Sequence, residues 1–134
     1  MLHGAPHACR IAIIAETLLH AVSLRISEVM SIIDSFEKML ASGKDSPLLR
    51  FSLGNEYLKV DDVIRAVDHL RASVALDAGY SAAWKLLGKA LTKAGDITGA
   101  SDAYAAGIAA ATAKGDKQAA KEMAVFLKRL DSIK

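Results

Sequence analysis

The sequence predicts an all-α fold made of repeated pairs of antiparallel helices. The 134-residue chain has only two prolines, and 52% of its residues are hydrophobic. These apolar residues recur at three- to four-residue steps, as they do along one face of a helix. In addition, the pair Leu53-Gly54 returns 34 residues later as Leu87-Gly88. A period of that length is typical of helix-turn-helix arrays.

Other positions agree at the same offset. They are Tyr57 with Leu91, Asp62 with Asp96, Val63 with Ile97, Ala66 with Ala100, Leu70 with Tyr104, and Ala72 with Ala106. With Trp84 before Leu87, the chain resembles a small bacterial-type member of the tetratricopeptide repeat family. The chain departs from the family pattern at three positions. The family has tryptophan at the position of Arg50, and it has proline at the positions of Ala78 and Thr112. The resemblance implies a short right-handed solenoid that recognises other proteins without doing chemistry.

Composition narrows the class of partner. The formal net charge is +2, the pI is about 8.7 and 24% of the residues are charged. Because proteins that bind nucleic acids carry clustered basic charge, we expect no nucleic-acid partner. The single cysteine, Cys9, excludes an internal disulfide and suits a reducing compartment. Cys9 lies near His3 and His7, but a structural zinc site needs four ligands, so we expect no metal and no cofactor.

Residues 1–29 differ from the rest and are predicted to form an N-terminal extension. Their apolar stripe is Ile11, Ile14, Leu18, Val22, Ile26 and Val29, and the opposite polar stripe is Glu16, His20, Ser23 and Ser27. The pattern indicates an amphipathic helix loosely docked on the repeats, with a disordered segment as the alternative. Charged residues interrupt every long apolar run and no signal-peptide cleavage site follows. We therefore expect no membrane partner and a cytoplasmic location.

The folded domain is predicted to span residues 30–134 and to open with a leading helix at residues 31–42. Ser31 can cap this helix, with Asp34 three residues on, and Gly43 can end it in the left-handed conformation. Pro47 then follows Ser46, at a position where the first turn of a helix tolerates proline.

Repeat one is predicted at residues 47–79 and repeat two at residues 81–113. The expected helices cover residues 47–59 and 63–76, then 82–93 and 97–113, with Ser81 as the N-cap of the third. A capping helix at residues 116–131 is expected to cover the last apolar face of the solenoid. Gly54 and Ala66 mark a close approach of two helices, and Trp84 is the expected largest core anchor.

The first helix of each pair is expected to line the concave side, which receives partners. Periodicity assigns to this groove Leu48, Phe51, Asn55, Leu58 and Lys59 from repeat one, and Ala82, Lys85, Lys89, Thr92 and Lys93 from repeat two. Some tetratricopeptide domains hold the carboxylates of a peptide terminus with lysine and asparagine, and Asn55, Lys85 and Lys89 are similar in type. The alternative is an ordinary solvated helix face.

These observations predict a non-catalytic module that binds a protein or an acidic peptide in the concave groove, as a monomer or weak homodimer. The alternative is a homo-oligomerising scaffold that buries Leu48, Phe51 and Leu58 against another copy. An enzyme is not expected, because the histidines are scattered, Cys9 has no partnering base and no glycine-rich phosphate loop follows a strand.

Overall fold

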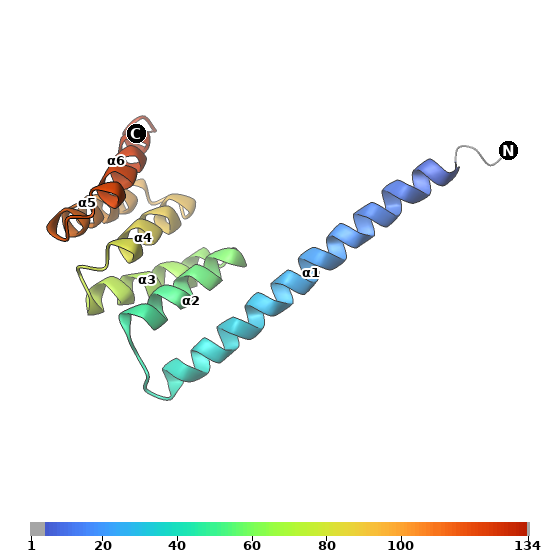
Figure 1. Ribbon diagram of the computed structural model, residues 1–134, viewed down its shortest axis with the longest axis horizontal. Helices are drawn as coiled ribbons and strands as arrows, with labels where there is room; N and C mark the ends of the chain where they lie inside the picture. The colour runs from blue at the N-terminus through green and yellow to red at the C-terminus, as the bar shows by residue number, and fades with distance from the viewer. Residues whose placement is uncertain (1–4, 134) are drawn as a thin grey trace.

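The computed structural model of the protein describes residues 5–133, with side chains from residue 13 onward. Over this range the chain forms six helices and no strand, which confirms the all-α fold class. The helices are α1 (Ala5–Ala41), α2 (Pro47–Lys59), α3 (Val63–Leu76), α4 (Ser81–Lys93), α5 (Ile97–Ala113) and α6 (Lys117–Asp131). α2 pairs with α3 and α4 pairs with α5, while α6 packs against α5 (Figure 1).

One serine and three aspartates cap the helices of the repeats. Ser46 Oγ accepts a hydrogen bond from the backbone N–H of Leu49, with Pro47 in the first turn of α2. Before α3, α5 and α6, the caps are Asp62, Asp96 and Asp116, each accepting from the N–H three residues on. The expected cap at Ser81 is wrong: α4 already includes Ser81, and Tyr80 precedes it without a side-chain bond.

Four of the five turns between the described helices use left-handed backbone; the exception is the turn between α3 and α4. Gly43 follows α1 with φ of 90°, as predicted, and Gly95 and Gly115 have φ of 85° and 78°. The equivalent residue of repeat one is Asp61, which lies 34 residues before Gly95 and has φ of 61°. Asp61 therefore holds a conformation that glycine adopts without steric cost.

In each pair, a glycine of the first helix lies in close contact with a side chain of the second. A Cβ atom on Gly54 would lie 2.5 Å from Leu70 Cγ, and one on Gly88 would lie 2.5 Å from Tyr104 Cε1. Carbon atoms do not pack that closely, so only glycine fits at these two points. Because Leu70 and Tyr104 are themselves 34 residues apart, the structure confirms the predicted repeat seam.

Two clusters of buried side chains make up the core. The larger joins α3, α4, α5 and α6 and includes Leu70, Val74, Leu87, Leu91, Tyr104 and Met123. The smaller joins α1, α2 and α3 and consists of Val29, Ile33, Leu49, Leu53, Tyr57 and Ala66. α6 closes the larger cluster, because Met123 is fully buried there, as expected for a capping helix.

Trp84 contributes less to the core than predicted. The largest fully buried side chains include Leu53, Leu70 and Met123, whereas Trp84 is only partly buried. Its Nε1 donates to the carbonyl oxygen of Ala78 at 2.8 Å. The indole N–H requires a polar partner, and this holds the ring at the boundary between the two repeats rather than deep inside either.

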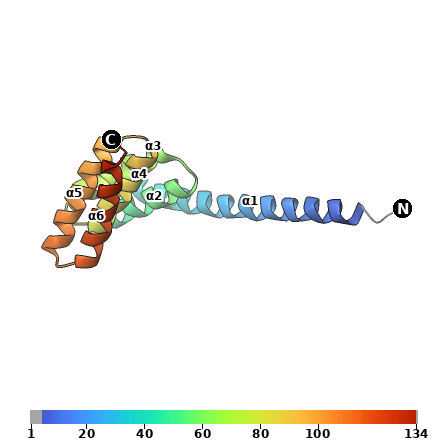
Figure 2. The same cartoon turned by 90° about the horizontal axis from the view of Figure 1, so that it is seen from above.

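α1 is one continuous helix, so the helix start predicted at residue 31 is wrong. Ser31 lies inside α1, because no proline or glycine interrupts the chain between Pro6 and Gly43 and a helix propagates where nothing stops it. Only the C-terminal part of α1 packs on α2, through Val29 and Ile33, and the remainder extends away from the repeats (Figure 2). The domain boundary at residue 30 stays a prediction.

A polar network fastens the end of α1 to the first repeat. Arg50 donates from Nε and Nη2 to both carboxylate oxygens of Asp45, at 2.8 and 3.0 Å, and this hydrogen bonding lowers the pKa of Asp45. His69 bridges Arg50 Nη1 and Glu37 Oε1, with 3.2 Å on each side. Tyr57 Oη donates to Glu37 at 2.8 Å. Arg50 therefore has a structural role where the family pattern has tryptophan.

Candidate partner-binding surface

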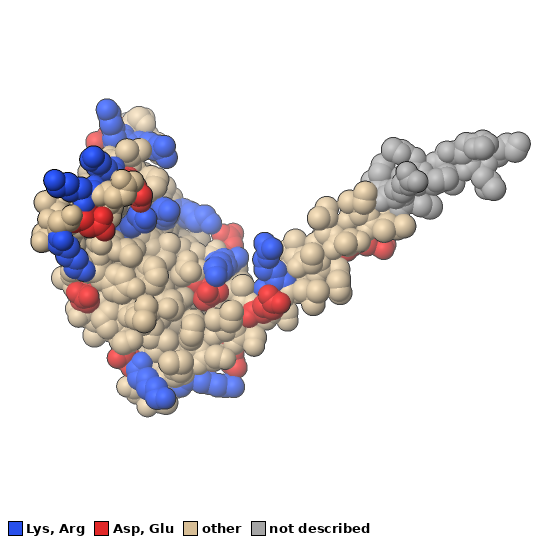
Figure 3. Space-filling model, viewed as in Figure 1, with Lys and Arg blue, Asp and Glu red and all other residues tan. Residues whose placement is uncertain are grey.

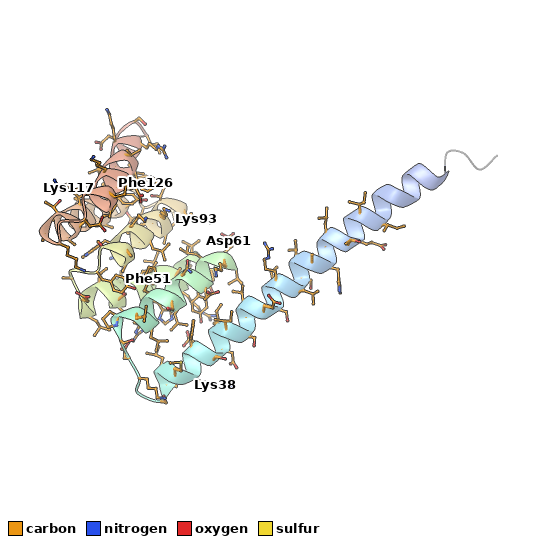
Figure 4. All side chains as sticks on the ribbon, in the orientation of Figure 1. Lys38, Phe51, Asp61, Lys93, Lys117 and Phe126 are labelled. Atoms are coloured by element: carbon orange, nitrogen blue, oxygen red, sulfur yellow. The ribbon has the colours of Figure 1, made fainter. Side chains whose placement is uncertain are left out.

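The ten residues predicted to line the groove lie on α2 and α4, the first helices of the two pairs. Leu48, Phe51, Asn55, Leu58 and Lys59 are on α2, and Ala82, Lys85, Lys89, Thr92 and Lys93 are on α4. Figure 4 shows Phe51 and Lys93 on these two neighbouring helices. Figure 3 shows that the Lys and Arg side chains of this face gather toward α4 and α6, whereas the surface over α2 is mostly uncharged.

The apolar half of the predicted groove is partly used by the fold itself. The ring of Phe51 stacks on that of Tyr80, with centroids 5.2 Å apart, and Leu58 packs against both core clusters. Leu48, by contrast, is 63% exposed. Of these three side chains, Leu48 is therefore the one that offers a largely free apolar surface.

Lys85 already holds a carboxylate. Its Nζ lies 3.0 Å from Glu122 Oε2 of α6, with about a third of the lysine side chain exposed. The hydrogen bond from Lys85 is the main cause that lowers the pKa of Glu122 below 4.5. The amide of Gln118 and the charge of Lys89 act in the same direction. This part of the surface therefore stabilises negative charge.

Lys89 and Arg129 share one aromatic ring. The ammonium of Lys89 lies 5.2 Å from the centroid of Phe126, and the guanidinium of Arg129 lies 5.7 Å from it. Phe126 in turn packs on Tyr104, with ring centroids 5.6 Å apart. Cation–π contacts leave the donors of both cations free to bind an anion, and both side chains are exposed.

Lys59 and Lys93 are exposed by half or more, but their partners differ. Lys59 Nζ lies 2.9 Å from Oε1 of Glu56, a buried residue on the same helix, so Lys59 is committed to balancing a carboxylate inside the fold. Lys93 Nζ lies 3.7 Å from Oδ1 of the exposed Asp61 (Figure 4). Exposed ion pairs contribute little, about 0–1 kcal/mol, so a partner's carboxylate can compete for Lys93.

The contribution of α6 was missed in the prediction. Glu122, Phe126 and Arg129 follow one another at steps of four and three, which places them on one face of a helix. That spacing is present in the sequence, but Phe126 also packs against the core on Tyr104, so the spacing alone does not show that this side of the helix reaches α4. The contacts with Lys85 and Lys89 show that this side of α6 adjoins α4.

The cluster of His3, His7 and Cys9, where we expect no metal, lies outside the side chains that the structure describes. His3 lies outside the described residues, and the side chains of His7 and Cys9 are not described. Among the side chains of residues 13–133, no group of three or more His, Cys, Asp or Glu residues could hold a metal ion. Across residues 5–133, no helix is long and apolar enough to cross a membrane.

Stacked helix pairs with a capped end define a helical repeat protein, a class whose exposed helix faces bind other proteins. No protein-family model matches the chain. The TPR repeat-containing protein PA0015 of Pseudomonas aeruginosa is 56% identical over 99 residues, covering 74% of this chain and 94% of the relative. This chain belongs to the tetratricopeptide repeat family, whose members are in general non-catalytic interaction modules.

Solved structures show the same relationship. Protein BPP2914 of Bordetella parapertussis is 48% identical, with a TM-score of 0.65, and the match covers 75% of this chain and 88% of that protein. The crystal structure of a tetratricopeptide repeat domain protein of Salinibacter ruber is 27% identical, with a TM-score of 0.63. The match covers 67% of this chain and 100% of the Salinibacter protein.

Proposed function

We propose that the protein binds an acidic segment of another protein on the face formed by α2, α4 and α6. The observation that carries this proposal is the Lys85–Glu122 contact, in which the surface holds a carboxylate at 3.0 Å. Next to it, Lys89, Lys93 and Arg129 form what we call the basic face. Its cations keep donors exposed to solvent, and an acidic partner would extend the charge pairing that Glu122 begins.

The apolar part of the same surface gives the partner a second requirement. Leu48, at 63% exposed, lies on α2 where this face borders the cavity lined by Phe36 and Met39 of α1, and it can receive one apolar side chain, with the edge of Phe51 beside the next repeat. An extended or helical segment with one or two apolar residues followed by acidic ones fits this order. Because two repeats supply a small surface and a flexible peptide loses entropy on docking, we expect a micromolar Kd.

The alternative function, a homo-oligomerising scaffold that uses Leu48, Phe51 and Leu58, has less support. Phe51 and Leu58 are half buried in contacts within the chain, so only Leu48 would bring substantial new apolar area. A cytoplasmic location and the absence of enzymatic activity in this chain remain predictions.

The experiment is fluorescence anisotropy with a labelled peptide that contains leucine and glutamate, and with the same peptide carrying glutamine for glutamate. Lys89→Glu with Lys93→Glu should weaken binding of the acidic peptide at least about tenfold, the equivalent of 1.4 kcal/mol. Added salt should weaken binding to the wild type, because exposed charges are screened within about 8–10 Å.

The matched control is Lys44→Glu with Lys114→Glu, which makes the same change of net charge outside the basic face. It should leave the affinity within about twofold of the wild type. Equal loss in both double variants would mean that only net charge matters. Equal binding of the glutamate and glutamine peptides would reject an acidic partner.

A further inference from the structure

The part of α1 that extends from the repeats carries an uncovered apolar stripe. Ile14, Leu18, Val22 and Ile26 recur every four residues and are exposed by 59%, 62%, 53% and 47%. The stripe continues at Val29 and Ile33, on the same helix face, and there it is buried against α2 at 8% and 5% exposure. The face that packs inside the molecule at one end of α1 is thus open to water at the other.

The base of α1 borders two cavities in line, which together we call the α1–α2 groove. A cavity of about 550 Å³ is lined by Arg25, Ile26, Glu28, Val29, Ile32 and Lys59, and one of about 310 Å³ by Phe36, Met39, Ser46, Leu48, Leu49 and Ser52. Both lie between α1 and α2, and Arg25, Ile32 and Met39 recur at steps of seven, so the two cavities follow one side of α1. At 1.5 Å per residue this groove is about 21 Å long.

We infer that two copies of this chain associate through α1, each placing its projecting apolar stripe along the α1–α2 groove of the other. The segment from Ile14 to Ile26 is about 18 Å long, which suits the length of the groove. Stripe and groove belong to the same chain and run along the same helix. In a dimer with two-fold symmetry, the stripe of each copy therefore packs in the groove of the other, which makes the interface isologous and the two α1 helices antiparallel.

The apolar area is sufficient for a weak dimer. The exposed side chains on or beside the stripe are Ile14, Leu18, Leu19, Val22, Ile26, Met30 and Ile32. At about half exposure they offer roughly 500–700 Å² of aliphatic surface per copy, of which a groove on one side of the helix would cover about 300–400 Å². Since little more than half of an ordinary interface is apolar, this corresponds to about 1,200 Å² in total, the low end for a specific complex. The dimer should therefore dissociate in the micromolar range.

The charges beside the stripe favour a second copy over a lipid surface. From residue 13 to residue 28 the charged side chains are Glu16, Arg25 and Glu28, so this part of α1 carries one more acid than base. Helices that lie on anionic membranes carry a polar face rich in lysine and arginine. α1 lacks such a face over this range, and its apolar stripe is long and aliphatic, as in a helix that packs on another helix.

The test is sedimentation velocity of the full chain from low micromolar to several hundred micromolar concentration. Leu18→Glu with Val22→Glu should weaken self-association at least about tenfold. The control, Ser23→Glu with Ser27→Glu, adds the same two charges to the polar side of the same helix and should associate like the wild type. Ile32→Glu, at the base of the groove, should weaken association although it leaves the projecting stripe intact.

Three results would overturn the inference. The first is a wild type that stays monomeric at the highest concentration. The second is equal self-association of the two double variants. The third is a monomeric wild type that floats with phosphatidylserine-containing vesicles, together with loss of this lipid binding in the Leu18→Glu and Val22→Glu variant. Far-UV circular dichroism checks that each variant keeps its helix, and if the stripe variant unfolds, the comparison of Ile32→Glu with the control decides.

Discussion

At the two helix crossings, the hydrogen atom of a glycine decides how closely the helices pack. Gly88 faces the ring of Tyr104 and Gly54 faces the branched end of Leu70, and a Cβ at either position would overlap its neighbour. The rings and branches cannot withdraw, because Tyr104 and Leu70 are themselves buried at 3% and 0% exposure. The crossing distance is therefore set by the smallest residue and the bulk of its partner.

Gly88→Leu should lower the free energy of unfolding by about 1–3 kcal/mol or more, because a bulky side chain must displace Tyr104 from the core. Urea denaturation measures the change. Ala82→Leu is the control, since Ala82 is an exposed residue of the same helix and the substitution should be nearly neutral. Equal midpoints for the Gly88 variant and the wild type would contradict the close crossing.

Asp61 shows how one repeat differs from the other at a single residue. Glycine holds the left-handed turn in repeat two and before α6, at Gly95 and Gly115, but repeat one has Asp61 at φ of 61°. Aspartate tolerates this conformation better than most residues, because its short side chain can bond locally. The repeat pattern alone predicts the position of the turn, but not which residue type adopts the left-handed conformation there.

At the scale of helices, α4 and α6 are joined by a contact that depends on pH. Lys85 lowers the pKa of Glu122 relative to 4.5, so the ionised carboxylate is favoured in the folded protein. A carboxyl group whose folded pKa is depressed stabilises the fold above its unfolded pKa. That contribution is lost as pH falls through the folded value.

Glu122→Gln should therefore lower the thermal midpoint near neutral pH, and the difference from the wild type should shrink as the pH falls below 4.5. Melting curves from about pH 7 to about pH 3 measure it, and salt should reduce the difference at neutral pH because both side chains are partly exposed. A difference that stays constant across this range would show that the charge of Glu122 is not involved.

The helices of the repeats were more predictable than the contacts between them. Residues 47–59, 63–76 and 97–113 form helices as expected, because the turns and caps that bound them are local and depend on adjacent residues such as Pro47. Contacts such as Lys85–Glu122 join positions 37 residues apart, and their pairing depends on how α6 settles on α4. A helical period indicates which face a residue shares, but not which helix meets that face.

The wrong helix start at residue 31 has a similar cause, because a local pattern does not show what the preceding residues do. Ser31 and Asp34 form a valid capping pattern, yet a cap acts only where the chain must start a helix, and here the preceding residues are already helical. Likewise, Arg50 in the tryptophan position gave no local indication of the network through Asp45, His69 and Glu37. Its partners come from a loop and two other helices, so sequence spacing does not reveal them.

For the whole molecule, stability should depend on the base of α1 and not on its projecting part. Removal of residues 1–24 should change the thermal midpoint by less than about 4 °C, the shift expected for 1 kcal/mol in a domain of this size. Removal of residues 1–41 should lower it far more, because Val29 and Ile33 leave the core and Glu37 leaves the polar network. Both are measured at submicromolar concentration, below the micromolar range in which the α1 dimer is expected to form.

A large drop on removing residues 1–24 would mean that the projecting segment supports the fold of a single chain. An unchanged midpoint on removing residues 1–41 would mean that the smaller core cluster does not depend on α1.

Trp84 gives the protein a built-in optical reporter. It is the one tryptophan of the chain, and its indole Nε1 bonds to the Ala78 carbonyl where repeat one meets repeat two. Indole emission responds to the polarity around the ring, so the fluorescence of the unlabelled chain follows this single junction, while circular dichroism follows all helices together. If the two signals change at the same urea concentration, the repeats unfold as one cooperative unit; if the emission changes first, they separate before either one melts.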